Sequence, residues 1–241
     1  MESEQLNTKG KLILLPTPIK NLEDQDYFWY PSDVVSEIRI FAVEEIKTAR
    51  RWLRKLDSKF PIDSCEFHLI NEHTKENDLT KAKVQLDNGV TMGLMSEAGL
   101  PCIADPGWPL VRYAHEKKHI VIPHVGPSSL MMALMSSGQN GQNFTFHGYL
   151  PVEGLARSNK IKELDKIAWS SGYSQIFIET PYRNQQILDA LYNNCKQTTL
   201  ITIALAIDTK EQFIRTVYSK DIRKENLILE KSPAVFIIGR P

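Results

Sequence analysis

The sequence lacks several features that would assign it to a familiar class of protein. Its 241 residues include only three cysteines, Cys65, Cys102 and Cys195, in no metal-ligand spacing, so neither a disulfide framework nor a structural metal site is predicted. No stretch reaches the roughly 18 consecutive apolar residues of a membrane-spanning helix. The polar start, MESEQLNTKG, contains no basic segment followed by an apolar run. These absences predict a soluble protein of the cytoplasm that has no membrane partner and binds no metal.

The charge balance gives no overall signal for a polyanionic partner. Lysine plus arginine and aspartate plus glutamate number 29 each, so the net charge is zero. A nucleic acid would need a local basic surface, because phosphate contacts supply most of the affinity in such complexes. The segment KTARRWLRKL offers one, since its basic residues recur at three- and four-residue steps opposite an apolar face. It predicts an amphipathic helix whose basic face is either only solvated or binds RNA. The basic residues are Lys47, Arg50, Arg51, Arg54 and Lys55.

Three common catalytic motifs are also missing. The sequence has no G-x-x-x-x-G-K-[ST] phosphate loop, no G-x-G-x-x-G after the first apolar run and no G-x-S-x-G nucleophile turn. Nucleotide hydrolysis, dinucleotide binding and serine hydrolysis are therefore not supported. The six histidines show no i, i+4 pairing. Only His73 beside Glu72 forms a pair of interest, and an ordinary hydrogen-bonded histidine is the favoured interpretation there.

Short apolar runs alternate with helical patterns along the first part of the chain. Such alternation predicts a mostly parallel sheet with helices on its faces. The predicted strands there are 11–15, 37–43, 66–70, 90–95, 120–122 and 144–146, and the predicted helices are 47–56, 79–86, 110–116 and 128–136.

The pattern changes around the segment GYLPVEG, which is rich in turn residues and is followed by a polar, lysine-rich helix. Beyond it lie predicted strands 174–178, 200–206, 213–218 and 234–238 and a helix at 184–192, which together predict a mixed sheet. The chain is therefore predicted to form two α/β domains, 1–148 and 149–241.

Four loops follow predicted strands and gather small residues and prolines. They read PTPIKN, SEAGLPCIADPG, HVGPSS and ETPYR. In open α/β sheets ligands bind outside the carboxyl ends of the strands, so these loops are the candidate binding segments. Each one taken alone is also compatible with an ordinary turn.

The same loops carry a resemblance to a known family. MSEAGLPCIADPG resembles the S-D-A-G-x-P-x-x-S-D-P-G signature of the methylases that modify a ribose in small-subunit ribosomal RNA, a branch of the tetrapyrrole methylase superfamily. LLPTPIKNLED, VGPSSLMMAL, FHGYLP and ETPYR resemble further blocks of that branch, in the same order along the chain. The resemblance implies two α/β domains that hold S-adenosylmethionine in a cleft between them, a ribosomal RNA substrate and a homodimer.

Site residues follow from the resemblance position by position. Pro18 is expected beside the donor, and the second and third loops are expected to hold its methionine and ribose parts. Apolar residues of the second domain are candidates for the adenine pocket, with ordinary sheet core as an equal alternative. The loop residues are Ser96, Glu97, Ala98, Ile103, Ser128 and Ser129, and the second-domain candidates are Phe177, Ile178, Ala206 and Pro233.

Methyl transfer mainly requires that donor and acceptor be aligned at about 3 to 3.5 Å, and a ribose hydroxyl benefits from a nearby base. The sequence does not single out that base. The charged residues in suitable loops are Glu44, Glu45, Glu97, Asp105, Glu179 and Arg183.

Three blocks depart from the ribosomal branch, at 44–47, 71–74 and 206–210. They keep two alternatives open beside an RNA methyltransferase. One is a methyltransferase of a small molecule such as a tetrapyrrole, although the G-x-G-P-G-D first loop of those enzymes is not present. The other is a protein that binds S-adenosylmethionine without catalysis.

Overall fold

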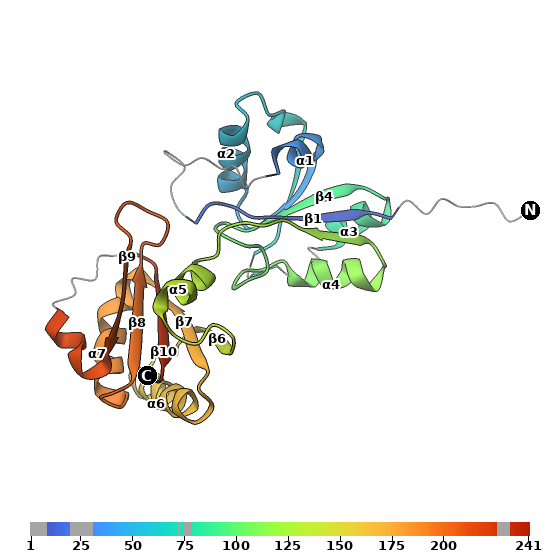
Figure 1. Ribbon diagram of the computed structural model, residues 1–241. Coiled ribbons are helices and arrows are strands. Elements are labelled where there is room, and N and C mark those ends of the chain that lie inside the picture. Colours follow the sequence, from blue (N-terminus) through green and yellow to red (C-terminus); the bar gives the residue numbers. More distant parts are fainter. Residues whose placement is uncertain (1–8, 20–30, 72, 75–78, 226–231) are drawn as a thin grey trace, which may run out of the picture. The chain divides into compact units, whose positions relative to one another are not determined.

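A computed structural model describes residues 9–19, 31–71, 73–74, 79–225 and 232–241 of the chain. Part of the first predicted loop, from Lys20 onward, lies outside the described residues, and so does Glu72, the predicted neighbour of His73. The chain divides into two compact units, 1–128 and 129–241 (Figure 1).

The first unit is built on a five-stranded parallel sheet. Its strand order is β3-β2-β4-β1-β5, and every neighbouring pair is parallel, as the alternating pattern predicts. The strands are β1 (Lys11–Leu15), β2 (Ile40–Val43), β3 (Glu66–Leu69), β4 (Thr91–Met95) and β5 (Ile120–Pro123).

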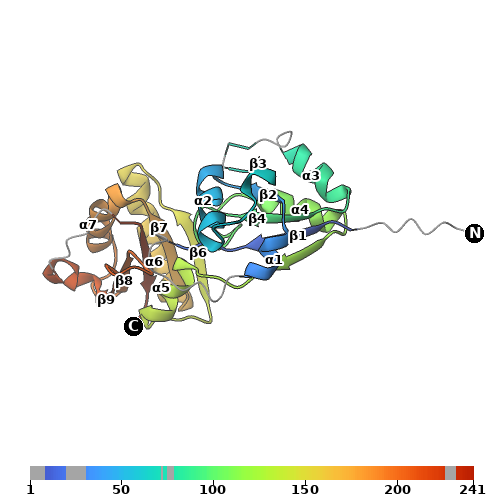
Figure 2. The same ribbon diagram turned by 90° about the horizontal axis from the view of Figure 1, so that it is seen from above.

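Helices cover both faces of this sheet (Figures 1 and 2). On one face α1 (Ser32–Glu37), α2 (Ile46–Leu56) and the short helix η1 (Ile62–Ser64) enclose a core around Phe41 and Trp52. On the other face α3 (Thr80–Asp87) and α4 (Trp108–Glu116) pack over Leu12, Met92 and Leu94. Burial on both faces explains why the inner strands β1, β2 and β4 are largely apolar rather than alternating.

One predicted strand begins too early. The predicted strand 37–43 starts only at Ile40, because Glu37 ends helix α1. This helix was not predicted. Its first turn is held by the Val35 amide, which donates to the Pro31 carbonyl at 3.0 Å, and Ser36 Oγ donates to the Asp33 carbonyl at 2.7 Å.

The second unit contains a mixed five-stranded sheet of order β6-β7-β10-β8-β9. Only β6 and β7 pair in parallel, and the other three pairs are antiparallel, so the predicted mixed sheet is confirmed. The strands are β6 (Phe144–Tyr149), β7 (Ser174–Glu179), β8 (Leu200–Leu205), β9 (Phe213–Tyr218) and β10 (Ala234–Gly239).

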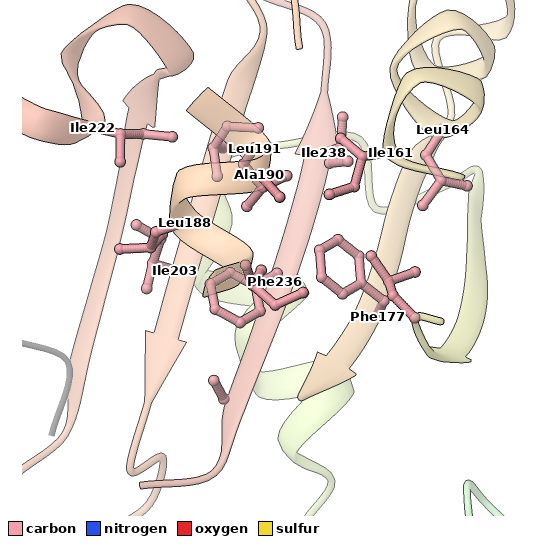
Figure 3. Close-up of a cluster of buried hydrophobic side chains, with 14 of the residues drawn as sticks. Ile161, Leu164, Phe177, Leu188, Ala190, Leu191, Ile203, Ile222, Phe236 and Ile238 are labelled. Carbon is pink, nitrogen blue, oxygen red and sulfur yellow. The ribbon is translucent and has the colours of Figure 1, made fainter. Parts of the chain in front are cut away.

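Two cores lie on the two faces of the second sheet. The larger core lies under α6 (Gly154–Ser171) and α7 (Asn184–Asn194). The short helix η3 (Pro181–Arg183) precedes α7, and η4 (Ser219–Glu225) follows β9. In the larger core Phe177 stacks on Phe236 with ring centroids 5.4 Å apart (Figure 3). Helix α5 (Ser129–Ser137) supplies Leu130, Ala133 and Leu134 to the opposite face.

The division between the units differs from the predicted ranges 1–148 and 149–241. The segment 129–148 belongs to the second unit, because α5 packs against the second sheet and β6 pairs with β7. The sequence signal at GYLPVEG marks the turn between β6 and α6 rather than the passage between the units.

Candidate functional site

The topology of the first sheet places a binding site between β1 and β4. These strands are neighbours, yet the chain leaves β1 toward β2 on one side and leaves β4 toward β5 on the other. Adjacent parallel strands whose connections diverge leave a crevice at their carboxyl ends, where ligands of open α/β proteins bind. The loops that follow β1 and β4 are two of the four predicted binding segments.

Backbone contacts hold these two loops together. Thr17 and Gly99 form an isolated bridge, in which the Thr17 amide donates to the Gly99 carbonyl at 2.8 Å and the Gly99 amide donates to the Thr17 carbonyl at 3.0 Å. The Thr17 hydroxyl donates to the Ser96 carbonyl at 3.3 Å, and the Ser96 hydroxyl donates to the Gly99 carbonyl at 3.3 Å. The bridge fixes Pro18, which is buried, directly beside the second loop.

The loop after β5 reaches the same place. Gly99 has a φ of +81°, and a Cβ built on it would lie 3.5 Å from the Pro127 carbonyl oxygen. Ser128 follows at once and is buried, whereas Ser129 begins α5 of the second unit. Three loops far apart in sequence therefore meet around Gly99.

The residues of the β4 loop that are predicted to contact S-adenosylmethionine differ in exposure. Ser96 is buried and structural in its contacts, whereas Glu97, Ala98 and Ile103 are exposed. Two residues nearby, Cys102 and Ala104, have positive φ angles of 68° and 64°. Non-glycine residues adopt this conformation rarely and at a cost, and such strain concentrates at functional sites.

An acidic cluster lies at the same edge of the sheet. Glu44, the residue after β2, accepts a hydrogen bond from the Glu97 amide at 2.8 Å through Oε2. Burial, followed by the charges of Glu44 and Glu97, raises the pKa of Asp105 from its ordinary value to about 7. Glu44 and Glu97 therefore place negative charge beside half-buried Asp105, which suits a positively charged ligand.

The structure separates the six charged candidates by role. Glu45 is the N-cap of α2, where its carboxylate accepts from the Thr48 amide at 2.6 Å, and these backbone bonds, that from Lys47 first, lower its pKa. Glu179 and Arg183 pair with each other in the second unit. Glu44, Glu97 and Asp105 remain together at the carboxyl edge of the first sheet, and Asp105 was not distinguishable from the others in the sequence.

The second-unit candidates fall into two groups. Ile178, Ala206 and Pro233 lie at one end of the second sheet, since the Ala206 amide donates to the Pro233 carbonyl at 3.3 Å and Val235, two residues on, pairs with Ile178. Phe177 instead has a fully buried side chain in the core under α6 and α7 (Figure 3). That side chain fills the sheet core and offers no surface to a ligand within this unit.

The basic face of α2 is partly neutralised. Arg50 lies 3.0 Å and Arg54 3.8 Å from the Asp63 carboxylate, and the Arg50 guanidinium also lies over the Phe67 ring. No ion pair within the described part of the chain is found for Arg51 or Lys55, whereas the charge of Lys47 acts on the nearby Glu45 carboxylate and helps to lower its pKa. The predicted RNA contact of this face stays a prediction.

Two features are absent from the described residues. No group of three or more His, Cys, Asp or Glu side chains there is arranged to hold a metal ion. No helix within the described ranges is long and apolar enough to cross a membrane.

The raised pKa of Asp105 gives a stability prediction. Unfolding restores the ordinary carboxyl pKa, so the contribution of Asp105 is most favourable below the unfolded pKa and is lost as the pH rises through about 7. The pKa shift of Asp105 corresponds to a change of at most about 4 kcal/mol in the free energy of unfolding. Because this group is only half-buried, solvent screening reduces the change to about 1–2 kcal/mol. Asp105→Asn should therefore raise the free energy of unfolding at pH 8 and change it little at pH 4. Urea titrations at both pH values measure this, and an equal effect at both would contradict the assignment.

Solved structures with the same architecture define the class of fold. The chain superimposes on the methyltransferase CobJ with a TM-score of 0.59 and 16% identity, over 96% of this chain and 94% of that one. It superimposes on the uroporphyrin III C-methyltransferase of Thermus thermophilus with a TM-score of 0.54 and 11% identity, over 95% and 97% of the two chains. The fold is that of the tetrapyrrole methylases.

Sequence comparison gives the family. No family model matches the chain. Curated relatives do match it, among them three that are each named ribosomal RNA small subunit methyltransferase I. That of Vibrio cholerae is 35% identical over 75% of this chain and 60% of its own length, that of Bacillus subtilis is 30% identical over 88% and 69%, and that of Buchnera aphidicola is 26% identical over 99% and 79%. The chain belongs to the ribosomal RNA small subunit methyltransferase I family of tetrapyrrole methylases. It spans about 60% of the Vibrio cholerae relative.

Proposed function

We propose that the protein is an S-adenosylmethionine-dependent methyltransferase that modifies a ribose hydroxyl in small-subunit ribosomal RNA. One observation carries the proposal. The loops after β1, β4 and β5 meet at Gly99, at the carboxyl ends of β1 and β4, where the connections that follow these two strands diverge. Relatives of the chain bear the name of a ribosomal RNA small subunit methyltransferase.

The chemistry of these loops fits the donor. S-adenosylmethionine supplies a methyl group that is activated by a positively charged sulfonium. Glu44 and Glu97 place negative charge at the same edge, beside half-buried Asp105, and this charge favours a cationic ligand. Gly99 allows close approach of the backbone, because it carries no Cβ. The residues proposed to hold the donor here are Pro18, Ser96, Glu97, Ala98, Ile103, Ser128 and Ser129.

Asp105 is also our candidate for the group that accepts the proton of the ribose hydroxyl. A general base acts best when its pKa lies near the working pH, and the Asp105 pKa of about 7 meets that condition. Ile178, Ala206 and Pro233 are proposed as adenine contacts. A homodimer is proposed from the family resemblance alone and is tested by sedimentation equilibrium.

Calorimetric titration with S-adenosylmethionine tests the donor site. We expect micromolar binding by the native protein. We expect its loss when Ser128, which is buried and follows Pro127 in the third loop, is replaced by phenylalanine. Ser136→Phe is the matched control, because Ser136 is exposed near the end of α5 and its replacement should leave affinity unchanged. If the Ser128→Phe variant keeps the native thermal unfolding transition and binds S-adenosylmethionine with unchanged affinity, the proposed position of the donor would be refuted.

Transfer of a labelled methyl group to small-subunit ribosomal RNA, from cells that lack the protein, tests the acceptor. Incorporation at a ribose supports the full proposal. Donor binding without incorporation into any RNA would refute the RNA substrate and favour a small-molecule acceptor or a non-catalytic protein.

A further inference from the structure

A group of large apolar side chains is exposed where β6 and β7 end in the second unit. Tyr149, Val152, Leu155 and Tyr182 are 60%, 77%, 70% and 81% exposed. We call these four residues the tyrosine patch. They come from the end of β6, the turn that follows it, the first turn of α6 and η3, so the patch is assembled from two separate stretches of chain.

Specific contacts bring the two stretches together. Tyr149 pairs with Ile178 in the sheet register. The Arg183 guanidinium, next to Tyr182, donates to the Leu150 carbonyl at 3.0 Å and is itself held by the buried Glu179 carboxylate. Arg157 donates to the Val152 carbonyl at 2.8 Å. The turn after β6 is thereby tied to η3 on one side and to α6 on the other.

The exposed face of α6 continues the patch with positive charge. Leu155, Asn159, Lys162 and Lys166 recur at three- and four-residue steps and are all exposed. The three acidic side chains nearby have other partners. Glu163 pairs with Lys160, buried Asp165 accepts from Thr199 and the Lys196 amide, and the carboxylate of Glu153 caps α6 by accepting from the Leu155 and Ala156 amides. No carboxylate in the described part of the chain pairs with Lys162 or Lys166. Figure 1 shows α6 beside β7.

Aromatic side chains next to unpaired lysines favour a nucleic acid over a protein partner. Protein interfaces are enriched in tyrosine but depleted in lysine, whereas nucleic-acid interfaces are polar and positively charged. Exposed tyrosines can stack on bases only where the bases are unpaired, because a duplex hides their faces. The combination therefore fits a single strand with bases on the tyrosines and phosphates along α6.

We propose that the tyrosine patch binds unpaired bases of the RNA substrate, and that Lys162 and Lys166 bind the adjoining phosphates along α6. This inference rests on the proposed RNA methyltransferase function. It adds a specific requirement to that function, namely a single-stranded segment in the RNA. This surface is distinct from the basic face of α2, which lies in the other unit.

Binding of a fluorescently labelled 12-nucleotide single strand, compared with a hairpin duplex of the same composition, tests the proposal. Replacing Tyr149 and Tyr182 with alanine should weaken single-strand binding roughly 5- to 100-fold for each stacked base and leave duplex binding unchanged. Lys162→Glu with Lys166→Glu should weaken binding and lower the slope of log affinity against log salt by roughly 2. Tyr173→Ala and Tyr218→Ala are matched controls, because these tyrosines are exposed elsewhere in the second unit.

S-adenosylmethionine titration of every variant separates this proposal from the proposed function. Weakened single-strand binding with unchanged donor affinity supports the patch. Native RNA affinity in the Tyr149→Ala/Tyr182→Ala variant would overturn it, as would an equal loss of duplex binding. Conversion of a dimer to a monomer without loss of RNA affinity would identify the patch as an interface between copies and also overturn it. A native protein that binds the donor but no RNA would refute the proposed function itself.

Discussion

Replacing Arg183 with alanine should lower the free energy of unfolding of the second unit by about 3–5 kcal/mol. The Glu179 carboxylate is completely buried, and Arg183 Nε donates to its Oε1 at 2.8 Å while a terminal nitrogen donates to Oε2. Without the guanidinium, the hydrogen-bond donors that remain to the carboxylate within the described residues are the Thr180 amide and hydroxyl, at 2.7 and 3.2 Å. An uncompensated buried charge is among the most destabilising results of a single substitution.

The measurement is urea denaturation followed by tryptophan fluorescence, to which Trp169 in α6 contributes from the second unit. Lys160→Ala is the matched control, since it removes a solvent-exposed pair with Glu163 on the same helix and should cost only about 0.2–0.5 kcal/mol. The double variant Glu179→Gln/Arg183→Met removes both charges and should be more stable than Arg183→Ala alone. If Arg183→Ala were no more harmful than the control, the pair would not be holding η3 against β6.

Much of the architecture follows from local sequence pattern, and the exceptions have physical reasons. Every predicted strand exists, because each is a short apolar run between turn residues. The division between the units could not be read in the same way, since the partner of β6 is β7, about thirty residues later. Helix α1 is short and polar, and only Val35 of its six residues is buried. Its sequence therefore has no apolar periodicity from which a helix could be predicted.

The candidate site was predictable as a set of loops but not as a set of contacts. Glycine and proline after strands indicate where a sheet ends. Three of the four resulting segments do meet around Gly99, whereas the fourth, ETPYR, belongs to the second unit. The role of each charged residue depends on folded surroundings: Glu45 caps a helix, Glu179 is neutralised by Arg183 and Asp105 is half-buried beside two carboxylates. Phe177 illustrates the same limit, because both faces of its strand are buried and periodicity does not tell core from pocket wall.

Binding of S-adenosylmethionine should strengthen as the pH rises from 6 to 8, by up to roughly tenfold for each unit by which the ligand lowers the Asp105 pKa. Free Asp105 has a pKa of about 7, so near neutral pH about half of the molecules carry a proton there. A cationic sulfonium nearby stabilises the carboxylate and lowers that pKa, and binding therefore releases the proton. Above the pKa of the free protein the carboxylate is already formed, and the affinity should level off.

S-adenosylhomocysteine is the matched ligand for this experiment, because it carries the same amino acid and nucleoside but a neutral sulfur. Its affinity should depend much less on pH, and the two ligands should diverge most above pH 7. Asp105→Asn removes the titrating group, so it should flatten the profile for S-adenosylmethionine and leave that for S-adenosylhomocysteine almost unchanged. Calorimetry in buffers of different ionisation enthalpy counts the protons released. Equal proton release with both ligands would mean that the charge of Asp105 does not act on the sulfonium, and the acidic cluster would then have to be assigned to the acceptor or to the structure of the loop.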